Sequence, residues 1–110
     1  MHFKSKLWLV NDKNIKFFGE GPMLLLKKTD ELGSLSKAAG EMNMSYSKAF
    51  HLIKNAEKEL SVSLLIGQAG GKSGGGSYIT EEAKELIKKY DQFIRRSDQA
   101  IEAIYHDIFL

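Results

Sequence analysis

Cysteine is absent from the 110-residue sequence, and its absence excludes disulfides, thiolate zinc sites and cysteine nucleophiles. Long apolar runs are also missing, because the longest, Met23 to Leu26, is far too short to span a bilayer. The N-terminus alternates lysine with apolar residues and lacks the apolar segment of a signal peptide. We therefore expect a cytoplasmic protein that has no membrane partner.

Charge of one sign is not in large excess, since the formal net charge is only +2 and the pI is about 8.8. Such mild basicity does not by itself indicate a nucleic-acid partner. His2, His51 and His106 are scattered and share no metal-ligand spacing with acidic residues. No nucleophile is paired with a base. We expect one domain with a modest core, no metal, no cofactor and no enzymatic activity.

The first twenty residues predict a β-hairpin. Segments 3–10 and 15–18 are rich in aromatic and β-branched residues, and the polar residues 11–14 between them form a turn. Pro22 follows and suits the first turn of a helix, which we predict over Met23–Leu32. The side chains that this helix should bury are Leu24, Leu25 and Leu32.

Two further helices with a tight turn between them are expected between Leu35 and Leu60. Gly33 ends the first helix, and Ser34 can cap a short helix that contains Leu35, Ala38, Ala39 and Met42. Asn43 tolerates the left-handed backbone of a tight turn. Ser45 then caps a helix to about Leu60, and the pair predicts a helix-turn-helix. The apolar positions at helical spacing in this last helix are Tyr46, Ala49, Phe50, Ile53, Ala56 and Leu60.

The second helix of a helix-turn-helix enters the major groove of DNA, and its outward face meets bases and phosphates. Lys48 and His51 lie in its first two turns and are expected to read bases, whereas Lys54 and Lys58 should touch phosphates. The same residue types occur on the solvated face of an ordinary three-helix core, and the face alone favours that simpler interpretation. The expected DNA-contacting residues of this region are Ser34, Ser45, Ser47, Lys48, His51, Lys54, Asn55 and Lys58.

The segment after this helix favours the DNA-binding interpretation. Residues 64–66 and 77–80 predict two short strands, and the residues between them are dominated by glycine. A helix-turn-helix followed by a β-hairpin is a winged helix. Gly67 precedes Gly71 by one residue too few for a nucleotide-binding Walker A loop. We expect Lys72 and Ser73 to lie along DNA phosphates, although a hairpin tip without function is the simpler alternative.

The last helix has the most regular pattern in the sequence. Thr80 caps it, and Glu81 and Glu82 suit the positive end of its dipole. Its apolar positions alternate four-three spacing, as in a coiled coil. The seam could pack on its own domain, but about 25 residues at roughly 1.5 Å each span about 38 Å, which outruns a small core. We therefore expect dimerisation through Ala83, Ile87, Tyr90, Ile94, Ile101, Ile104 and Ile108, with a second stripe of Leu86, Phe93 and Ala100.

Three stretches of the sequence resemble the N-terminal DNA-binding domain of ModE-type regulators, molybdate-responsive relatives of LysR-type winged helices. They are Gly33–Ala39, Met44–Phe50 and the glycine-rich Gly70–Thr80, and the N-terminal hairpin before Gly19 is similar too. Asn43 stands where such turns usually carry glycine. The resemblance implies DNA binding and dimerisation. Because the chain stops at Leu110, we expect that it lacks the oxyanion-binding domains of those regulators.

Together these features predict an α+β winged helix-turn-helix with an N-terminal β-hairpin and a long C-terminal dimerisation helix. Residues 1–80 would form the DNA-binding domain and residues 81–110 the dimerisation helix. We expect a homodimer that binds double-stranded DNA sequence-specifically and regulates transcription, with any effector acting through a separate effector-binding protein. The alternative is a winged-helix module that binds another protein and not DNA.

Overall fold

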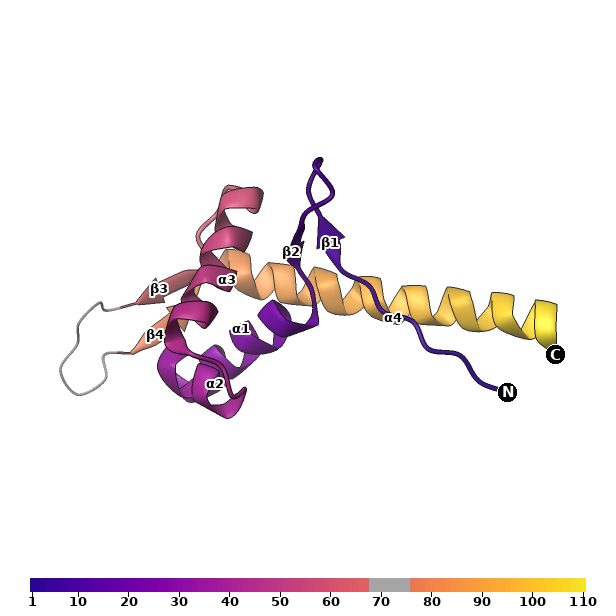
Figure 1. The fold of residues 1–110 in the computed structure, drawn as a ribbon, viewed down its shortest axis with the longest axis horizontal. Helices are drawn as coiled ribbons and strands as arrows, with labels where there is room; N and C mark the ends of the chain where they lie inside the picture. The colour runs from indigo at the N-terminus through magenta and orange to yellow at the C-terminus, as the bar shows by residue number, and fades with distance from the viewer. Residues whose placement is uncertain (68–75) are drawn as a thin grey trace.

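The computed structural model describes residues 1–67 and 76–110. Figure 1 shows a small helical domain at one end of a long helix, α4, with an N-terminal hairpin standing beside the domain. The described elements are β1 (Leu9–Val10), β2 (Lys16–Phe18), α1 (Glu20–Leu32), α2 (Leu35–Glu41), α3 (Tyr46–Leu60), β3 (Leu65–Gly67), β4 (Ser77–Ile79) and α4 (Glu81–Phe109). The predicted α+β winged helix-turn-helix is thereby confirmed.

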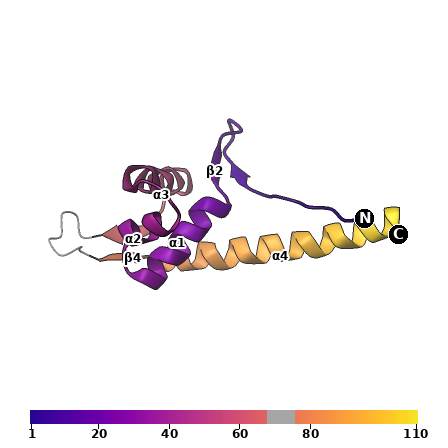
Figure 2. The same cartoon turned by 60° about the horizontal axis from the view of Figure 1, so that its bottom comes forward.

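The N-terminal hairpin is shorter than the sequence suggested. Strand β1 pairs antiparallel with β2 over only two residues, with an irregular register between Leu9 and Val10. The prediction of a strand over 3–10 is wrong for residues 3–8, because these residues run along α4 instead (Figure 2). Tyr90 Oη donates to the Leu7 carbonyl at 2.7 Å, and Tyr105 Oη donates to the Met1 carbonyl at 2.7 Å. Backbone acceptors in this segment are therefore used by helix side chains rather than by a strand.

Helix α1 begins at Glu20, three residues before its predicted start, and ends where Gly33 adopts a left-handed backbone with φ 69°. Leu25 and Leu26 are fully buried, as expected of a core helix. The prediction that Leu24 is buried is wrong, since 41% of it is exposed. Helical geometry turns Leu24 out of the core when its neighbours Leu25 and Leu26 both face inward.

The helix-turn-helix forms as its local signals predict. Ser34 Oγ accepts a hydrogen bond from the Lys37 N–H at 3.1 Å and caps α2. Ser45 Oγ accepts one from the Lys48 N–H at 3.1 Å and caps α3. Asn43 takes the left-handed backbone of the turn with φ 53°. Ser34 marks the start of α2, Asn43 the turn after it, and Ser45 the start of α3.

The core lies where α1, α2, α3 and the start of α4 meet, and Phe18 joins it from the hairpin. On α3, Ala49, Ile53 and Ala56 are buried. The expectation that Tyr46 and Phe50 belong to the core face is corrected, because they are 54% and 39% exposed. Both lie toward one edge of the buried face. Because they are four residues apart on the helix, their rings stack on each other, with centroids 6.0 Å apart.

The wing is an antiparallel pair in which β3 and β4 align Leu65 with Ile79 and Gly67 with Ser77. Thr80 links this pair to α4, because its Oγ1 donates to the Ser63 carbonyl at 2.6 Å and accepts from the Ala83 N–H at 3.0 Å. The predicted DNA-contacting residues Lys72 and Ser73 lie outside the described residues, and their role stays a prediction.

Part of the predicted dimerisation seam of α4 is buried within the single chain. Ala83 is fully buried and Tyr90 is only 6% exposed, so both belong to the core of the single chain. The prediction that these two side chains pair with a second chain is wrong, since the helical domain already covers them. Ile87 and Ile94 also pack against this core. Among the described residues, no helix has the length and hydropathy needed to cross a membrane.

Candidate nucleic-acid interface

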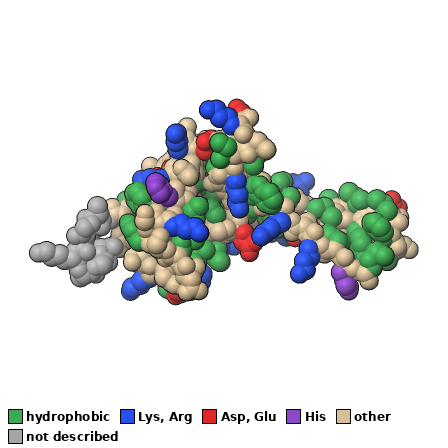
Figure 3. Space-filling view, viewed as in Figure 1, with side chains coloured by type: hydrophobic (Ala, Val, Ile, Leu, Met, Phe, Trp, Pro, Cys, Tyr) green, Lys and Arg blue, Asp and Glu red, His purple; other side chains and the backbone are tan. Residues whose placement is uncertain are grey.

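The surface of α3 that faces away from the core carries polar and basic side chains. Lys48, His51, Asn55 and Lys58 are all exposed and follow one another at spacings of three, four and three residues, so they form a single row, the outer stripe. Ile53 lies on the opposite side and is 1% exposed. Figure 3 shows basic side chains, in blue, and a histidine around α3 on one face of the molecule.

The hydroxyl residues predicted to meet phosphates lie at the helix starts. Ser45 precedes α3 and Ser47 lies in its first turn, and both are exposed. Ser34 lies at the start of α2 and is half-buried. The capping bonds use the Ser34 and Ser45 oxygens as acceptors. Each hydroxyl proton therefore remains available for a phosphate oxygen.

Lys54 differs from the other predicted DNA-contacting lysines. Its Nζ lies 3.1 Å from Glu57 Oε1 and 5.2 Å from the centroid of the Phe50 ring. Of Lys48, Lys54 and Lys58, Lys54 alone has a carboxylate partner among the described residues. Glu57 thus partly neutralises the positive charge of Lys54, which makes Lys54 a weaker phosphate ligand than Lys58.

Glu57 is a residue of this region that sequence reasoning missed. Its Oε2 accepts hydrogen bonds from the N–H groups of Leu64 at 2.8 Å and Leu65 at 3.2 Å. Burial would raise the pKa of the Glu57 carboxyl, but the bond from Leu64 and those from Lys54 and Leu65 outweigh burial and hold this pKa below its usual range. The position of Glu57 near the C-terminus of α3 was the sequence signal for this role. A carboxylate there is disfavoured by the helix dipole and is stabilised by nearby hydrogen-bond donors.

The N-terminal hairpin is attached to the other side of α3. Asn11 Nδ2 donates to Glu59 Oε1 at 3.0 Å, while Asn11 Oδ1 accepts from the N–H groups of Lys13 at 2.9 Å and Ile15 at 3.0 Å. A single side chain thus closes the hairpin turn and holds it against α3. Sequence reasoning predicted the hairpin but not this attachment, because Asn11 and Glu59 are 48 residues apart. The outer stripe therefore runs between the wing and the hairpin.

From Phe93 onward, α4 leaves one apolar side uncovered. Phe93, Ile104 and Ile108 are 44%, 57% and 66% exposed. With the smaller Ser97 and Ala100 they follow the helix on one side, called here the open face. The neighbouring side is occupied by the N-terminal residues, since Phe3 packs against Tyr105 with ring centroids 5.0 Å apart. Hydrophobic side chains gather over this end of α4 in Figure 3. Of the predicted dimerisation residues, Ile104 and Ile108 remain exposed, and Ile101 is half-buried.

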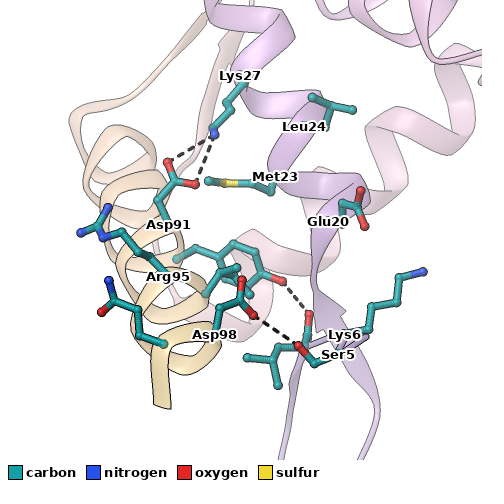
Figure 4. Close-up of a pocket in the computed structure, with 13 residues that line it drawn as sticks. Ser5, Lys6, Glu20, Met23, Leu24, Lys27, Asp91, Arg95 and Asp98 are labelled. Atoms are coloured by element: carbon teal, nitrogen blue, oxygen red, sulfur yellow. Dashed lines mark hydrogen bonds and ion pairs between the residues drawn. The ribbon is translucent and has the colours of Figure 1, made fainter. Parts of the chain in front are cut away.

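A groove of about 690 Å³ lies between the N-terminal segment, α1 and α4, away from α3 (Figure 4). Two polar contacts cross it: Lys27 Nζ lies 3.2 Å from Asp91 Oδ2, and Ser5 Oγ donates to Asp98 Oδ1 at 3.2 Å. Burial, and then the nearby Glu20 carboxylate, raise the pKa of the Tyr90 phenol that closes one end. The Lys27–Asp91 pair joins α1 to α4, and the Ser5–Asp98 bond holds the N-terminal segment against α4.

A helix-turn-helix whose second helix bears an exposed basic row, followed by an antiparallel wing, defines a winged-helix protein of the nucleic-acid-binding type. Residues 23–84 match the bacterial regulatory helix-turn-helix proteins of the lysR family. This match covers more than half of the chain, and the chain belongs to that family.

Known relatives agree with this assignment. The chain is 32% identical over 80 residues to the transcriptional regulator ModE of Haemophilus influenzae, covering 73% of this chain and 31% of the relative. It is 34% identical over 84 residues to the DNA-binding transcriptional dual regulator ModE of Escherichia coli K12, covering 76% and 32%. The resemblance to ModE-type regulators is confirmed, and the matched region spans about a third of the length of these relatives.

A solved structure supports the fold. The crystal structure of ArgP from Mycobacterium tuberculosis aligns with a TM-score of 0.54 at 22% sequence identity, covering 77% of this chain and 30% of that one. The Haemophilus influenzae and Escherichia coli relatives are named as transcriptional regulators, and nothing among the described residues groups three potential metal ligands.

Proposed function

We propose that this protein binds double-stranded DNA sequence-specifically as a homodimer and regulates transcription, with α3 in the major groove. The observation that carries the proposal is the outer stripe. Lys48, His51 and Lys58 face solvent and form no ion pair among the described residues, so their donors remain available to a ligand. A row of uncommitted donors on the second helix of a helix-turn-helix fits the donor and acceptor pattern of base edges.

Position along α3 divides the stripe into two roles. Lys48 and His51 lie in the first two turns, which reach base edges in this motif, so we assign them to base readout. Lys58 lies in the last turn of α3 and is assigned to phosphates, together with the serine hydroxyls at the helix starts. Lys54 is assigned only a secondary contact with phosphates, because its ammonium group is paired with Glu57.

The open face of α4 supports dimerisation. It places Phe93, Ile104 and Ile108 in water along a helix of 29 residues. Exposed apolar surface of this extent marks an interaction site in soluble proteins. Ser97 and Ala100 lie between the larger side chains and allow a second helix to approach closely. A two-fold dimer built here would present two equivalent α3 helices to a roughly symmetric operator.

A second function, binding to another protein, is favoured by one observation. Tyr46 and Phe50 form an exposed aromatic pair on α3, and aromatic residues are enriched at the centres of protein interfaces. This surface borders the outer stripe, so a protein partner there would compete with DNA.

Selection of bound duplexes from random DNA, followed by titration at several salt concentrations, separates the two functions. Sequence-specific binding by α3 predicts an enriched motif and an affinity that falls steeply as salt rises, because counterions return to the phosphates. A protein-binding module predicts neither. Wild-type protein that shows no enrichment and no salt-dependent binding would refute the DNA-binding proposal.

A further inference from the structure

A second groove lies beside the outer stripe, where the hairpin meets α3. It has a volume of about 280 Å³ and lies between β2, the start of α1 and α3. Its polar side chains are Lys16, Lys48 and Asn55, and no acidic residue lines it. The groove between α1 and α4 differs, because there Glu20, Asp91 and Asp98 accompany the cations. The groove beside α3 is therefore the one whose charge suits a polyanion.

The wall that the hairpin contributes is held in place. Phe18 is fully buried and meets the Tyr90 ring edge-on, with centroids 5.2 Å apart. At the other end, Asn11 binds Glu59 on α3. Two anchors at opposite ends of the hairpin fix its orientation relative to α3. A ligand that binds between the hairpin and α3 therefore requires little loss of conformational entropy from the protein.

Lys16 is directed by its neighbours. Its Nζ lies 5.5 Å from the centroid of the Trp8 ring, and its side chain passes directly over Gly19. A Cβ added to Gly19 would lie 2.9 Å from Lys16 Cε, so the missing side chain at Gly19 leaves room for that path. Lys16 is exposed and forms no ion pair among the described residues.

We propose that this groove binds the sugar-phosphate backbone of the DNA, with Lys16 donating to a phosphate, so that the N-terminal hairpin acts as a second wing. Lys48 and Asn55 belong both to the outer stripe and to the groove. A duplex that lies on the stripe must therefore pass the mouth of the groove. The positive lining complements the phosphate charge, and contacts of this kind position the protein without reading sequence. The inference rests on the proposed DNA binding.

The test compares Lys16→Gln with Lys88→Gln, an exposed lysine on α4 that lines neither groove. Binding of the full chain to a selected duplex and to a random duplex is measured across a salt series. Loss of one phosphate contact reduces the slope of log affinity against log salt by about 0.9 per protomer. We expect this reduction for Lys16→Gln on both duplexes and no change for Lys88→Gln.

Trp8 gives a second readout, because it is the only tryptophan of the chain and lies beside Lys16. DNA in the groove should change Trp8 emission in the wild type, and the change should shrink in Lys16→Gln. Gly19→Ala keeps the charge but displaces the Lys16 side chain, so it should lower affinity less than Lys16→Gln. Circular dichroism verifies that each variant is folded.

The outcomes separate the two proposals. Wild-type binding with an unchanged salt slope and unchanged Trp8 response in Lys16→Gln would refute the second wing and leave DNA binding by α3 intact. Absence of any wild-type binding would refute both. A reduced slope confined to Lys16→Gln supports the second wing.

Discussion

Glu57 Oε2 accepts a hydrogen bond from the Leu64 N–H at 2.8 Å, and this bond joins α3 to the start of the wing. Leu64 is itself fully buried, so the wing is fixed on one side by packing and on the other by a carboxylate. Asn11 and Glu59 play the same part for the hairpin. The outer stripe is thereby framed by two β-hairpins, each tied to α3 by a polar side chain.

Glu57 should make the free energy of unfolding depend on pH in the acidic range. The pKa of Glu57 in the folded chain lies below the usual glutamate pKa of 4.5, so its contribution to stability is full above that pH. It is lost as pH falls through the lower, folded pKa. Glu57→Gln should lower the free energy of unfolding at pH 7 by about 1–3 kcal/mol and flatten its decline in acid. Urea unfolding between pH 7 and pH 3 measures both effects. Glu85→Gln, at an exposed position, is the control; an equal loss in both variants would contradict the account.

Dimerisation should depend on Ile104. Replacement by aspartate places a charge on the open face, where pairing would bury it, so the dimer should dissociate. Because Ile104 is 57% exposed in the single chain, the monomer should keep its fold. Sedimentation equilibrium measures the change, and Gln99→Asp, roughly opposite on α4, should remain dimeric. An unchanged dimer in Ile104→Asp would place the interface elsewhere.

Lys72 is expected to contact a phosphate from the glycine-rich segment. Lys72→Ala should lower affinity similarly for all DNA sequences and reduce the salt slope by about one unit. Fluorescence anisotropy on selected and random duplexes across a salt series checks this. A changed sequence preference with the original slope would show that Lys72 reads bases instead.

Oxyanions should have no direct effect on this chain. One matched relative, from Herbaspirillum seropedicae, is named a molybdenum transport protein, 32% identical over 93 residues. We propose that the 110 residues bind DNA without an oxyanion and that any effector acts through a separate protein. Calorimetry with molybdate and tungstate should show no binding, and anisotropy should show unchanged DNA affinity. Tight binding of either ion would overturn this proposal.

Local signals in the sequence located most helix boundaries. Ser34, Ser45 and Thr80 cap their helices because a cap needs only the N–H three residues onward. Asn43 likewise takes the turn conformation that its short polar side chain tolerates. These features depend on a few neighbouring residues, so the sequence alone sufficed to predict them and the outer stripe that they orient.

Features that depend on distant contacts were missed. Periodicity assigned Phe50 to the core and Tyr90 to a dimer interface. In the structure Phe50 is exposed and Tyr90 is buried, because burial depends on which distant parts of the chain pack against each residue. Residues 3–8 have strand-like composition, yet on α4 Tyr90 donates to the Leu7 carbonyl and Tyr105 packs against Phe3. The Asn11–Glu59 bond could not be predicted because its two partners lie 48 residues apart and leave no spacing pattern in the sequence.

The central claim, that the first two turns of α3 read DNA sequence, is tested most directly by comparing affinities for a selected and a random duplex. Lys48→Ala and His51→Ala should each weaken binding to the selected duplex by about 1–3 kcal/mol and change binding to random DNA little. Lys58→Ala should weaken both duplexes by the same factor, because a phosphate contact carries no sequence information. Equal losses on both duplexes for all three variants would contradict the assignment of base readout to Lys48 and His51.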